Sequence, residues 1–391
     1  MRRSQDSLTP ASVHTLFHKY LLQHLPLADF KDSVTALQLA DLLTLMAATA
    51  RTLFATVRER FPFSHETARK AVYACLPELD TLAVACTNLF HAIAGFSALE
   101  RKRSWILALD THNDPYYGSR KTKHILGGQR NRGTKYFHVY ASAALLHKHR
   151  RYTIALLPIT ESLPVHAIVE KLLEQIRSRG LKIKGVVLDS GFDSADTILL
   201  LQNLGVSYTV PLRRKGSTSN RRNDLFAHPS GTLLDATWKS EKTRKEVTTR
   251  VLVWQRPGEA TTEVKVFAFQ GWGDARAVAE FRRARLARQR YRERFGIETS
   301  YRQKNQALAW TTSRDSTYRF LLEALGQALR QLWVRLTQTI AQVRGLKPTA
   351  WVGELTLVDL LQWLTERLFA LHPRKHRIEL AGKDLEPQPA C

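Results

Sequence analysis

Acidic residues follow two apolar runs of the chain. Asp110 comes directly after residues 105–109, and Asp189 comes directly after residues 186–188. If both runs are strands of an open α/β sheet, their carboxyl ends face one crevice. A third carboxylate, Glu298, stands in a strongly basic segment. Three converging carboxylates suit Mg²⁺, and metal ions held in this way catalyse phosphoryl transfer.

Each of these acids alone has a simpler explanation. An aspartate at a strand end is often a turn former or a helix N-cap, and a glutamate on an arginine-rich helix is often an exposed ion-pairing residue. The combination favours the metal site because arginines would hold a DNA backbone that acids alone repel.

The basic segment, residues 281–304, holds nine Arg or Lys and only two acids, Glu293 and Glu298. On a helix that turns about 100° per residue, Tyr291, Arg294 and Glu298 fall within about 60° of one another. Glu293 points about 140° away from Glu298. Helix geometry therefore favours Glu298 as the third carboxylate, with Tyr291 and Arg294 placed to position a phosphate.

The net charge of the protein indicates which classes of partner it binds. The 391 residues include 59 Lys+Arg and 35 Asp+Glu, a formal charge of +24. With 44% hydrophobic residues the chain can bury a core of two or three domains, which argues against a disordered basic tail. The charge predicts a polyanionic partner, DNA, RNA or anionic lipid, before an acidic protein.

Cysteine usage and hydropathy favour a reducing, intracellular compartment. Cys75, Cys86 and Cys391 form no CxxC pair and have no histidine at zinc spacing beside them, which predicts neither a disulfide framework nor a zinc module. The uncharged residues 81–99 carry several polar side chains, so we expect a buried helix and no membrane span.

An α/β core must position the acids. Apolar runs predict strands at 105–109, 136–141, 152–157, 185–188 and 206–210, with helices at 165–179 and 195–202. This order is typical of an α/β domain with a mixed sheet. Alternating segments at 232–238, 246–253 and 263–269 predict a β insertion, after which helix resumes at Asp274 and continues past Glu298.

Helical regions flank this core. Residues 1–104 are predicted to be all-helical with a role in DNA-end binding; the turn at Leu76-Pro77 fits either a helix-turn-helix or ordinary bundle packing. Helices predicted at 318–343 and 355–371 either pack within the monomer or form a dimer contact. The predicted divisions are 1–104, 105–210 (first part of the core), 211–272 (insertion), 273–312 (helix with Glu298) and 313–391.

The sequence resembles DDE transposases of prokaryotic insertion sequences, in the insertion-sequence-four group with the signature Tyr-x2-Arg-x3-Glu-x6-Lys and its halobacterial-type relatives. Residues 291–302 match the start of this signature, and Leu109-Asp110-Thr111 and residues 188–194 resemble the two aspartate motifs. The resemblance covers about residues 104–312. It implies an RNase H-like core with a β insertion, and Asp110, Asp189 and Glu298 as the metal-binding triad.

The signature lysine is where the sequence departs from this group. Asn305 occupies its place, and Lys304 stands one residue early, about 120° from the Glu298 face of an ideal helix. Arg302 lies about 40° from that face. We predict that Arg302, or Lys304 after a local distortion, contacts the phosphate.

Other residues have weaker claims. His112 and Asp114 could contact metal or substrate, although Asn-Asp-Pro is an ordinary turn sequence, and Asp193 fits an N-cap better than a ligand. Residues 120–135 are predicted to form a flexible basic hairpin. This hairpin either lies on DNA or is a solvated surface without a partner. One of three tryptophans in or beside the insertion could stack on a base, with core packing as the alternative: Trp238, Trp254 and Trp272.

The combined prediction is a Mg²⁺-dependent DNA transposase, with Mn²⁺ able to substitute. It would cut the 3′ ends of its element and join the freed 3′-OH to target DNA, in cut-and-paste transposition. It would bind terminal inverted repeats and target DNA, act as a homodimer in a synaptic complex, and by the resemblance work in the prokaryotic cytoplasm near the nucleoid. Two alternatives stay open: an RNase H-like structure-selective nuclease, and a sequence-specific DNA-binding protein with an inactive triad.

Overall fold

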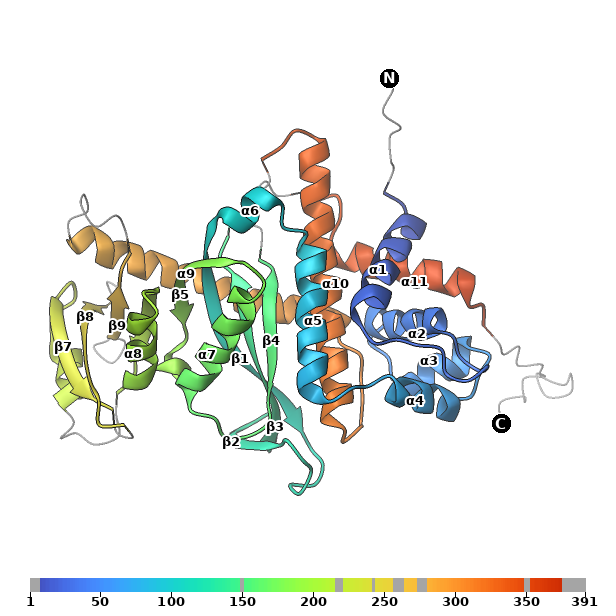
Figure 1. Cartoon of the computed structure of the whole chain (residues 1–391), viewed down its shortest axis with the longest axis horizontal. Helices are drawn as coiled ribbons and strands as arrows, with labels where there is room; N and C mark the ends of the chain where they lie inside the picture. The colour runs from blue at the N-terminus through green and yellow to red at the C-terminus, as the bar shows by residue number, and fades with distance from the viewer. Residues whose placement is uncertain are drawn as a thin grey trace, which may run out of the picture.

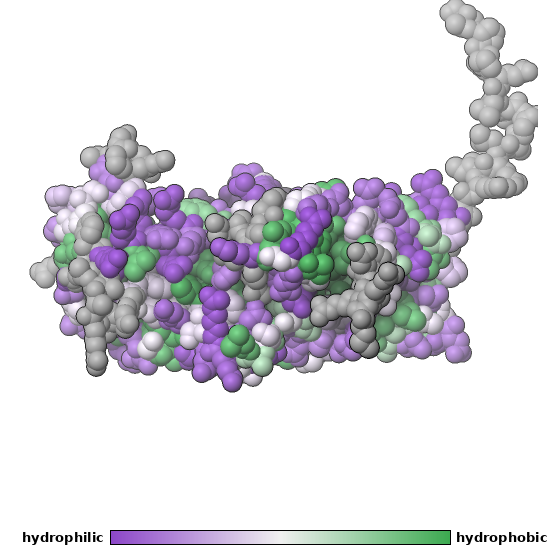
Figure 2. Space-filling view, turned by 90° about the horizontal axis from the view of Figure 1, so that it is seen from above, coloured by the Kyte–Doolittle hydropathy of each residue, from purple (hydrophilic) through white to green (hydrophobic). Residues whose placement is uncertain are grey.

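The computed structural model describes residues 8–147, 151–214, 221–240, 243–255, 264–272, 280–347 and 352–374. A twisted sheet runs through one half of an elongated molecule, and a cluster of helices forms the other half (Figure 1). Seen from above, polar and charged residues are spread over the surface with small apolar patches between them (Figure 2). Hydrophilic side chains thus cover much of this face, over a core of buried hydrophobic residues.

Nine strands of the described residues form one mixed sheet in the order β2-β3-β1-β5-β6-β9-β8-β7, with β4 also paired to β3. β1 pairs in parallel with β5, and β5 with β6, while the remaining pairs are antiparallel. The strands are β1 (Ser104–Tyr116), β2 (Leu126–Asn131), β3 (Thr134–Leu145), β4 (Thr153–Ile159), β5 (Lys182–Leu188), β6 (Ser207–Leu212), β7 (Leu233–Lys239), β8 (Glu246–Trp254) and β9 (Lys265–Gln270).

β1 is longer than the sequence indicates. The strand was expected over residues 105–109, but it continues to Tyr116 because its antiparallel pairing with β3 outlasts its parallel pairing with β5. Asp110 therefore lies inside β1, not at its end. The turn expected at Asn113-Asp114-Pro115 is wrong for the same reason, since these residues are paired with β3.

The predicted β insertion has its three strands close to the predicted positions, and they extend the core sheet. β9 pairs antiparallel with β6, and β8 and β7 follow. β2 was not expected as a strand; with β3 it forms a hairpin that turns at Arg132 (φ 50°) and Gly133 (φ 84°). The basic residues 120–135 are therefore partly a paired hairpin.

Helices cover the two faces of the sheet (Figure 1). On β1, Leu107 and Leu109 join the main core, while Ala108 packs against Ile297 of a helix on the opposite face. The helices and short 3-10 helices are α1 (Pro10–His24), α2 (Ala36–Ala48), α3 (Leu53–Arg60), α4 (His65–Ala74), α5 (Leu79–Ala94), α6 (Ala98–Lys102), α7 (Val165–Arg177), η1 (Ser190–Phe192), α8 (Ala195–Asn203), η2 (Arg221–Ala227), α9 (Glu280–Lys304), η4 (Asn305–Ala307), α10 (Ser316–Val343) and α11 (Leu357–Leu371). The predicted helix start at Asp274 lies outside the described residues.

The N-terminal and C-terminal helices pack on each other. α1 and α2 contact α11, and α5 packs between β4 and α10. Those contacts are typical of a core helix, so α5 is not the exposed second helix of a helix-turn-helix and the bundle alternative is favoured. Among the described residues no single helix is long and apolar enough to span a membrane; α2 and α3 meet that test only jointly, bent by 118°.

Candidate active site

Pairing of β1 and β5 places the two aspartates side by side. The last paired residues are Leu109 and Leu188, so Asp110 and Asp189 are the next residue on each strand. Asp110 is buried, and its Oδ1 accepts a hydrogen bond from the backbone N–H of Thr111 at 2.9 Å. Asp189 precedes η1, and its side chain is 35% exposed. Two carboxylates therefore meet where the parallel pair ends.

α9 brings the third carboxylate. The helix lies on the sheet through small and apolar side chains: Ile297 packs against Ala108 of β1, and Ala287 packs near Val187 of β5. This contact turns Glu298 toward the aspartates. Glu298 keeps 45% of its side chain exposed.

A single guanidinium joins the three acids. Arg294 is 4% exposed, and its two terminal nitrogens lie 3.4 Å from Asp110 Oδ2, 3.4 Å from Asp189 Oδ1 and 3.2 Å from Glu298 Oε1. The predicted acids therefore converge on one cation. Arg294 was expected to point at a phosphate, whereas here its side chain faces the acids.

Burial and the neighbouring charges together raise the pKa of Asp110. Burial, opposed by Arg294 and assisted by the nearby Asp189 and Glu298, raises the pKa of Asp110 to about 6. Three carboxylates against one guanidinium leave an excess of negative charge. That donor set suits one or two divalent cations, for which hard carboxylate oxygens are the preferred ligands.

Tyr291 stands one turn before Arg294. Its ring packs against Phe267 of β9 with centroids 5.0 Å apart, and the Arg294 guanidinium lies 5.4 Å from the ring centre. Burial raises the pKa of the Tyr291 hydroxyl. The residue is thus at the edge of the acidic cluster, on the helix face that the spacing predicts.

Arg302 and Lys304 differ sharply in accessibility. Arg302 is exposed, whereas Lys304 is fully buried and its Nζ lies 2.6 Å from Glu323 Oε2 of α10. A buried, ion-paired ammonium cannot reach DNA, so the predicted phosphate contact of Lys304 is wrong in this structure. Its partner Glu323 lies on another helix and has no local signal in the sequence.

His112 and Asp114 share the Asp110 face of β1 but have partners of their own. The His112 ring stacks on Tyr301 of α9 with centroids 5.0 Å apart, and Asp114 accepts from Arg319 of α10 at 3.1 Å. Asp193 pairs with Arg222 and accepts from the Arg213 N–H at 2.7 Å. The N-cap of α8 is Ser194, so the predicted cap at Asp193 is wrong.

The tryptophans of the insertion are core residues or lie under arginines. Trp272 is 3% exposed, and its indole N–H donates to the Tyr208 carbonyl at 2.8 Å. Trp254 is half-buried with the Arg288 guanidinium 3.5 Å from its ring centre. Trp238 is also half-buried.

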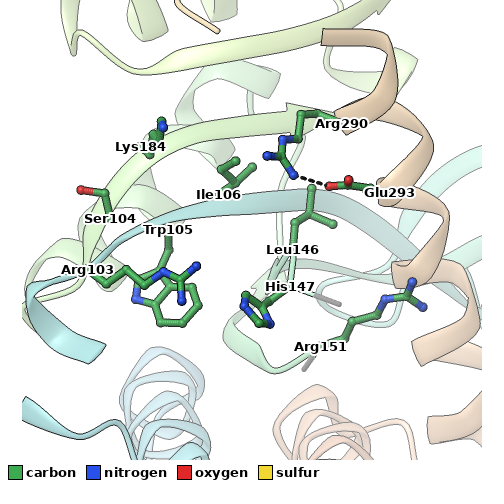
Figure 3. Close-up of a pocket in the computed structure, with 10 residues that line it drawn as sticks. All are labelled: Arg103, Ser104, Trp105, Ile106, Leu146, His147, Arg151, Lys184, Arg290 and Glu293. Carbon is green, nitrogen blue, oxygen red and sulfur yellow. Dashed lines mark hydrogen bonds and ion pairs between the residues drawn. The ribbon is translucent and has the colours of Figure 1, made fainter. Parts of the chain in front are cut away.

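A basic pocket of about 580 Å³ lies between β1 and α9, on the side of the sheet that α9 covers (Figure 3). Ile106, on the same face of β1 as Asp110, lines its floor. Sequence reasoning missed this pocket because its cations come from distant parts of the chain. They are Arg103, Arg151, Lys184 and Arg290, and the one acid among them, Glu293, pairs with Arg290 at 2.8 Å.

Comparison with known proteins agrees with this geometry. Residues 101–325, more than half of the chain, match the family model of the transposase DDE domain. No curated protein matches significantly in sequence. Among solved structures, the cryo-EM structure of the piggyBac transposase synaptic complex with hairpin DNA is similar, with a TM-score of 0.55 and 10% identity over 94% of this chain and 81% of that one.

The structural likeness confirms the predicted RNase H-like core, and the family match covers Asp110, Asp189 and Glu298. The chain belongs to the transposase DDE-domain family and is a DNA-cleaving and strand-transferring enzyme.

Proposed function

We propose that the protein is a cut-and-paste transposase of the insertion-sequence-four group, acting on double-stranded DNA in the prokaryotic cytoplasm. The observation that carries the catalytic assignment is the convergence of Asp110, Asp189 and Glu298 on the Arg294 guanidinium. The Tyr-x2-Arg-x3-Glu spacing of α9 supports the group. The similar solved structure is a synaptic complex, which supports action as a homodimer that holds DNA ends.

On the transferred strand at each end, the reaction has two phosphoryl transfers; excision also requires cleavage of the other strand. A water oxygen attacks the phosphorus at the element end, and the P–O bond to the 3′ oxygen breaks, which frees a 3′-OH. That 3′ oxygen then attacks a target phosphorus, and the target's own 3′ oxygen leaves. Bound at Asp110, Asp189 and Glu298, Mg²⁺ or Mn²⁺ would supply Lewis acidity for these steps.

The remaining residues would hold DNA. Arg302 is exposed on α9 beyond Glu298, and the basic pocket lies along the same face of β1 on the other side of Asp110. Ile106 and Asp110 are four residues apart, about 13 Å along a strand. We place the DNA backbone along this path, from Arg302 past the acids to the pocket, where cations would offset phosphate charge.

The test uses the full chain and DNA carrying the terminal inverted repeats that flank the gene. We expect Mg²⁺-dependent cleavage that Asp189→Asn and Glu298→Gln abolish, and joining of the product to a plasmid. Asp235→Asn, which changes an exposed acid of β7, serves as the matched control and should cut normally.

Each alternative predicts a different result. Cleavage without joining would indicate the structure-selective nuclease. Repeat binding without any cleavage in Mg²⁺ or Mn²⁺ would indicate a DNA-binding protein with an inactive triad. Either outcome would overturn the proposed cut-and-paste reaction.

A further inference from the structure

Four polar side chains converge inside the helical half of the molecule, far from the acids of the active site. His14 and His18 lie one turn apart on α1, Asp41 lies in the middle of α2, and His372 directly follows α11. His14 Nε2 lies 2.9 Å and His18 Nε2 3.1 Å from Asp41 Oδ1, and His372 Nε2 lies 2.8 Å from Asp41 Oδ2. One carboxylate therefore faces three imidazoles.

This cluster is buried and incompletely satisfied. His14, His18 and Asp41 are between 5% and 9% exposed. His18 Nε2 makes no hydrogen bond although it lies 3.1 Å from Asp41 Oδ1, the oxygen that His14 Nε2 also contacts. A buried polar atom without a partner destabilises the fold, and a ligand shared with the neighbouring nitrogen and oxygen atoms would satisfy it.

The side chains of the cluster are of types that bind metal ions. Three imidazole nitrogens and a carboxylate oxygen face one another within the bundle, and both groups are common zinc ligands.

We propose that His14, His18, Asp41 and His372 form a structural zinc site. Four-coordinate Zn²⁺ binds His nitrogen and Asp oxygen at about 2.0–2.2 Å, which separates neighbouring ligand atoms by roughly 3.4 Å in a tetrahedron. The candidate ligand atoms of His14, His18 and Asp41 all lie within 4.8 Å of one another. The contacts of His14 and His18 to Asp41 Oδ1, at 2.9 and 3.1 Å, would need to open by only a few tenths of an ångström. His372 contacts the other oxygen, Oδ2, at 2.8 Å and is not one of those three residues, so its side chain would have to shift to complete the site. Three nitrogens and one oxygen favour Zn²⁺ over Mg²⁺, which prefers oxygen ligands.

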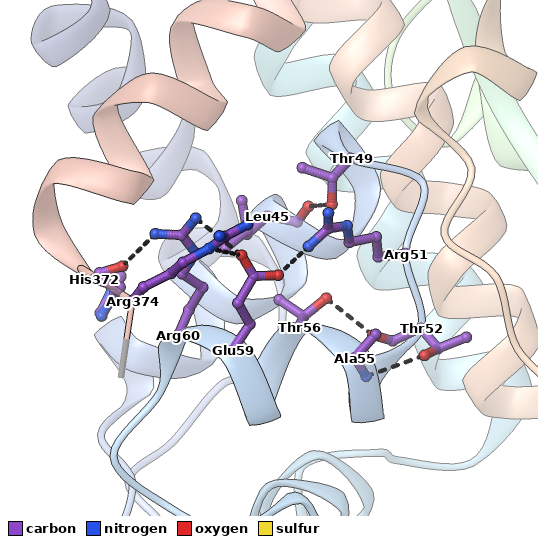
Figure 4. A network of polar contacts seen from close by, with 10 residues as sticks. All are labelled: Leu45, Thr49, Arg51, Thr52, Ala55, Thr56, Glu59, Arg60, His372 and Arg374. Atoms are coloured by element: carbon purple, nitrogen blue, oxygen red, sulfur yellow. Dashed lines mark hydrogen bonds and ion pairs between the residues drawn. The ribbon is translucent and has the colours of Figure 1, made fainter. Parts of the chain in front are cut away.

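Polar contacts outside the cluster hold His372 in place (Figure 4). The Glu59 carboxylate of α3 accepts from Arg374 at 2.8 Å and from Arg60 at 3.0 Å, and it also pairs with Arg51. The Arg60 guanidinium also lies 3.5 Å from the carbonyl oxygen of His372. These contacts fasten the segment after α11 to α3, so the fourth ligand is positioned by its surroundings.

The proposed zinc ion would cross-link three segments of the helical half of the molecule. Its ligands come from α1 and α2 near the start of the chain and from the end of α11, so one ion would join segments more than 300 residues apart in sequence. The site uses none of the residues of the active site. The proposal therefore stands or falls independently of the proposed function.

The test measures Zn²⁺ binding to the full chain in an Asp189→Asn background, which weakens metal binding at the active site. After EDTA treatment and dialysis against Zn²⁺, we expect one retained Zn²⁺ per chain by elemental analysis. Co²⁺ in its place should give the intense visible d–d absorption of a four-coordinate ion. His18→Gln should weaken Zn²⁺ binding at least about 100-fold, because loss of an outer-shell contact alone costs 10–100-fold.

His24→Gln is the matched control, since His24 ends the same helix and is not one of the four residues. It should keep both the Zn²⁺ and the Co²⁺ spectrum. If His18→Gln does not fold, His372→Gln at the edge of the bundle gives the same comparison. Equal Zn²⁺ retention by the parent and the histidine variants, or a parent that retains no Zn²⁺, would overturn the proposal. The cluster would then be held by hydrogen bonds alone.

Discussion

At the scale of single residues, Arg294 organises the acidic cluster. Its guanidinium contacts all three carboxylates, and it is almost fully buried while Asp189 and Glu298 remain partly open to water. The arginine offsets the mutual repulsion of the acids, which metal ions would otherwise relieve. Arg294 and a divalent cation thus have overlapping electrostatic roles.

Replacing Arg294 should destabilise the metal-free protein. Arg294→Gln leaves Asp110 buried beside two like charges, and we expect a loss of about 2–3 kcal/mol in the free energy of unfolding, less than for a fully buried pair because two of the acids reach solvent. Mg²⁺ should restore part of the loss. Urea denaturation with and without Mg²⁺ measures both effects. Arg290→Gln, whose partner Glu293 is half-exposed, should change stability by less than about 1 kcal/mol.

Arg302 and Lys304 should give opposite phenotypes. Lys304→Ala leaves the buried Glu323 without its cation and should cost about 3–5 kcal/mol of stability. Arg302→Ala should keep stability within about 0.5 kcal/mol but lower the salt dependence of DNA binding by about one phosphate contact. Melting curves and binding titrations at several salt concentrations separate the two. A stable Lys304→Ala protein with weakened DNA binding would reverse this assignment.

At the scale of elements, the close approach of neighbouring strands positions Asp189. Gly185 of β5 stands beside β6 and under the Trp272 ring. A Cβ at position 185 would lie 2.8 Å from the Ser207 carbonyl oxygen and 2.8 Å from the indole. The missing side chain thus lets β5 carry Asp189 to its place beside β1.

Gly185→Ala should therefore force β5 and β6 apart. We expect a loss of about 1–3 kcal/mol in the free energy of unfolding, the usual effect of overpacking a core. DNA cleavage should fall as well, because the displaced strand carries Asp189. Gly127→Ala on the exposed strand β2, where an added Cβ meets nothing within 4 Å, is the control and should leave both quantities unchanged.

At the scale of the whole molecule, several histidines are buried in the neutral form. Burial lowers the pKa of four of them to about 4. The unfolded chain therefore binds more protons than the folded chain below about pH 6.5. The stabilisation from these groups is fully present above that pH and is lost as the pH falls toward 4. The four are His18, His91, His112 and His138.

The metal-free protein should accordingly lose stability below pH 6.5, by about 1.4 kcal/mol per pH unit for each such histidine. Asp110, whose pKa is raised to about 6, acts in the opposite direction but is one group against four. Urea denaturation at pH 7 and pH 5 measures the slope. His91→Gln removes one titrating group while keeping a donor for the Ile154 carbonyl, so it should reduce the slope; an unchanged slope would contradict the argument.

Local sequence patterns were sufficient to predict the three acids of the active site. The apolar runs before Asp110 and Asp189 and the helix phase around Glu298 are local features of the sequence, and they placed the three acids on elements that meet. The same phase argument separated Glu298 from Glu293, which lines the basic pocket instead. The sequence by itself thus determined the elements and the residues that converge.

Only the tertiary structure decided what each side chain meets. The length of β1 depends on its pairing with β3, the burial of Lys304 depends on Glu323 of another helix, and the His–Asp cluster joins the two ends of the chain. Such contacts link residues far apart in sequence, and no periodicity or motif within one segment encodes the partner. Their energies come from burial and pairing in the assembled core, which exists only once the chain has folded.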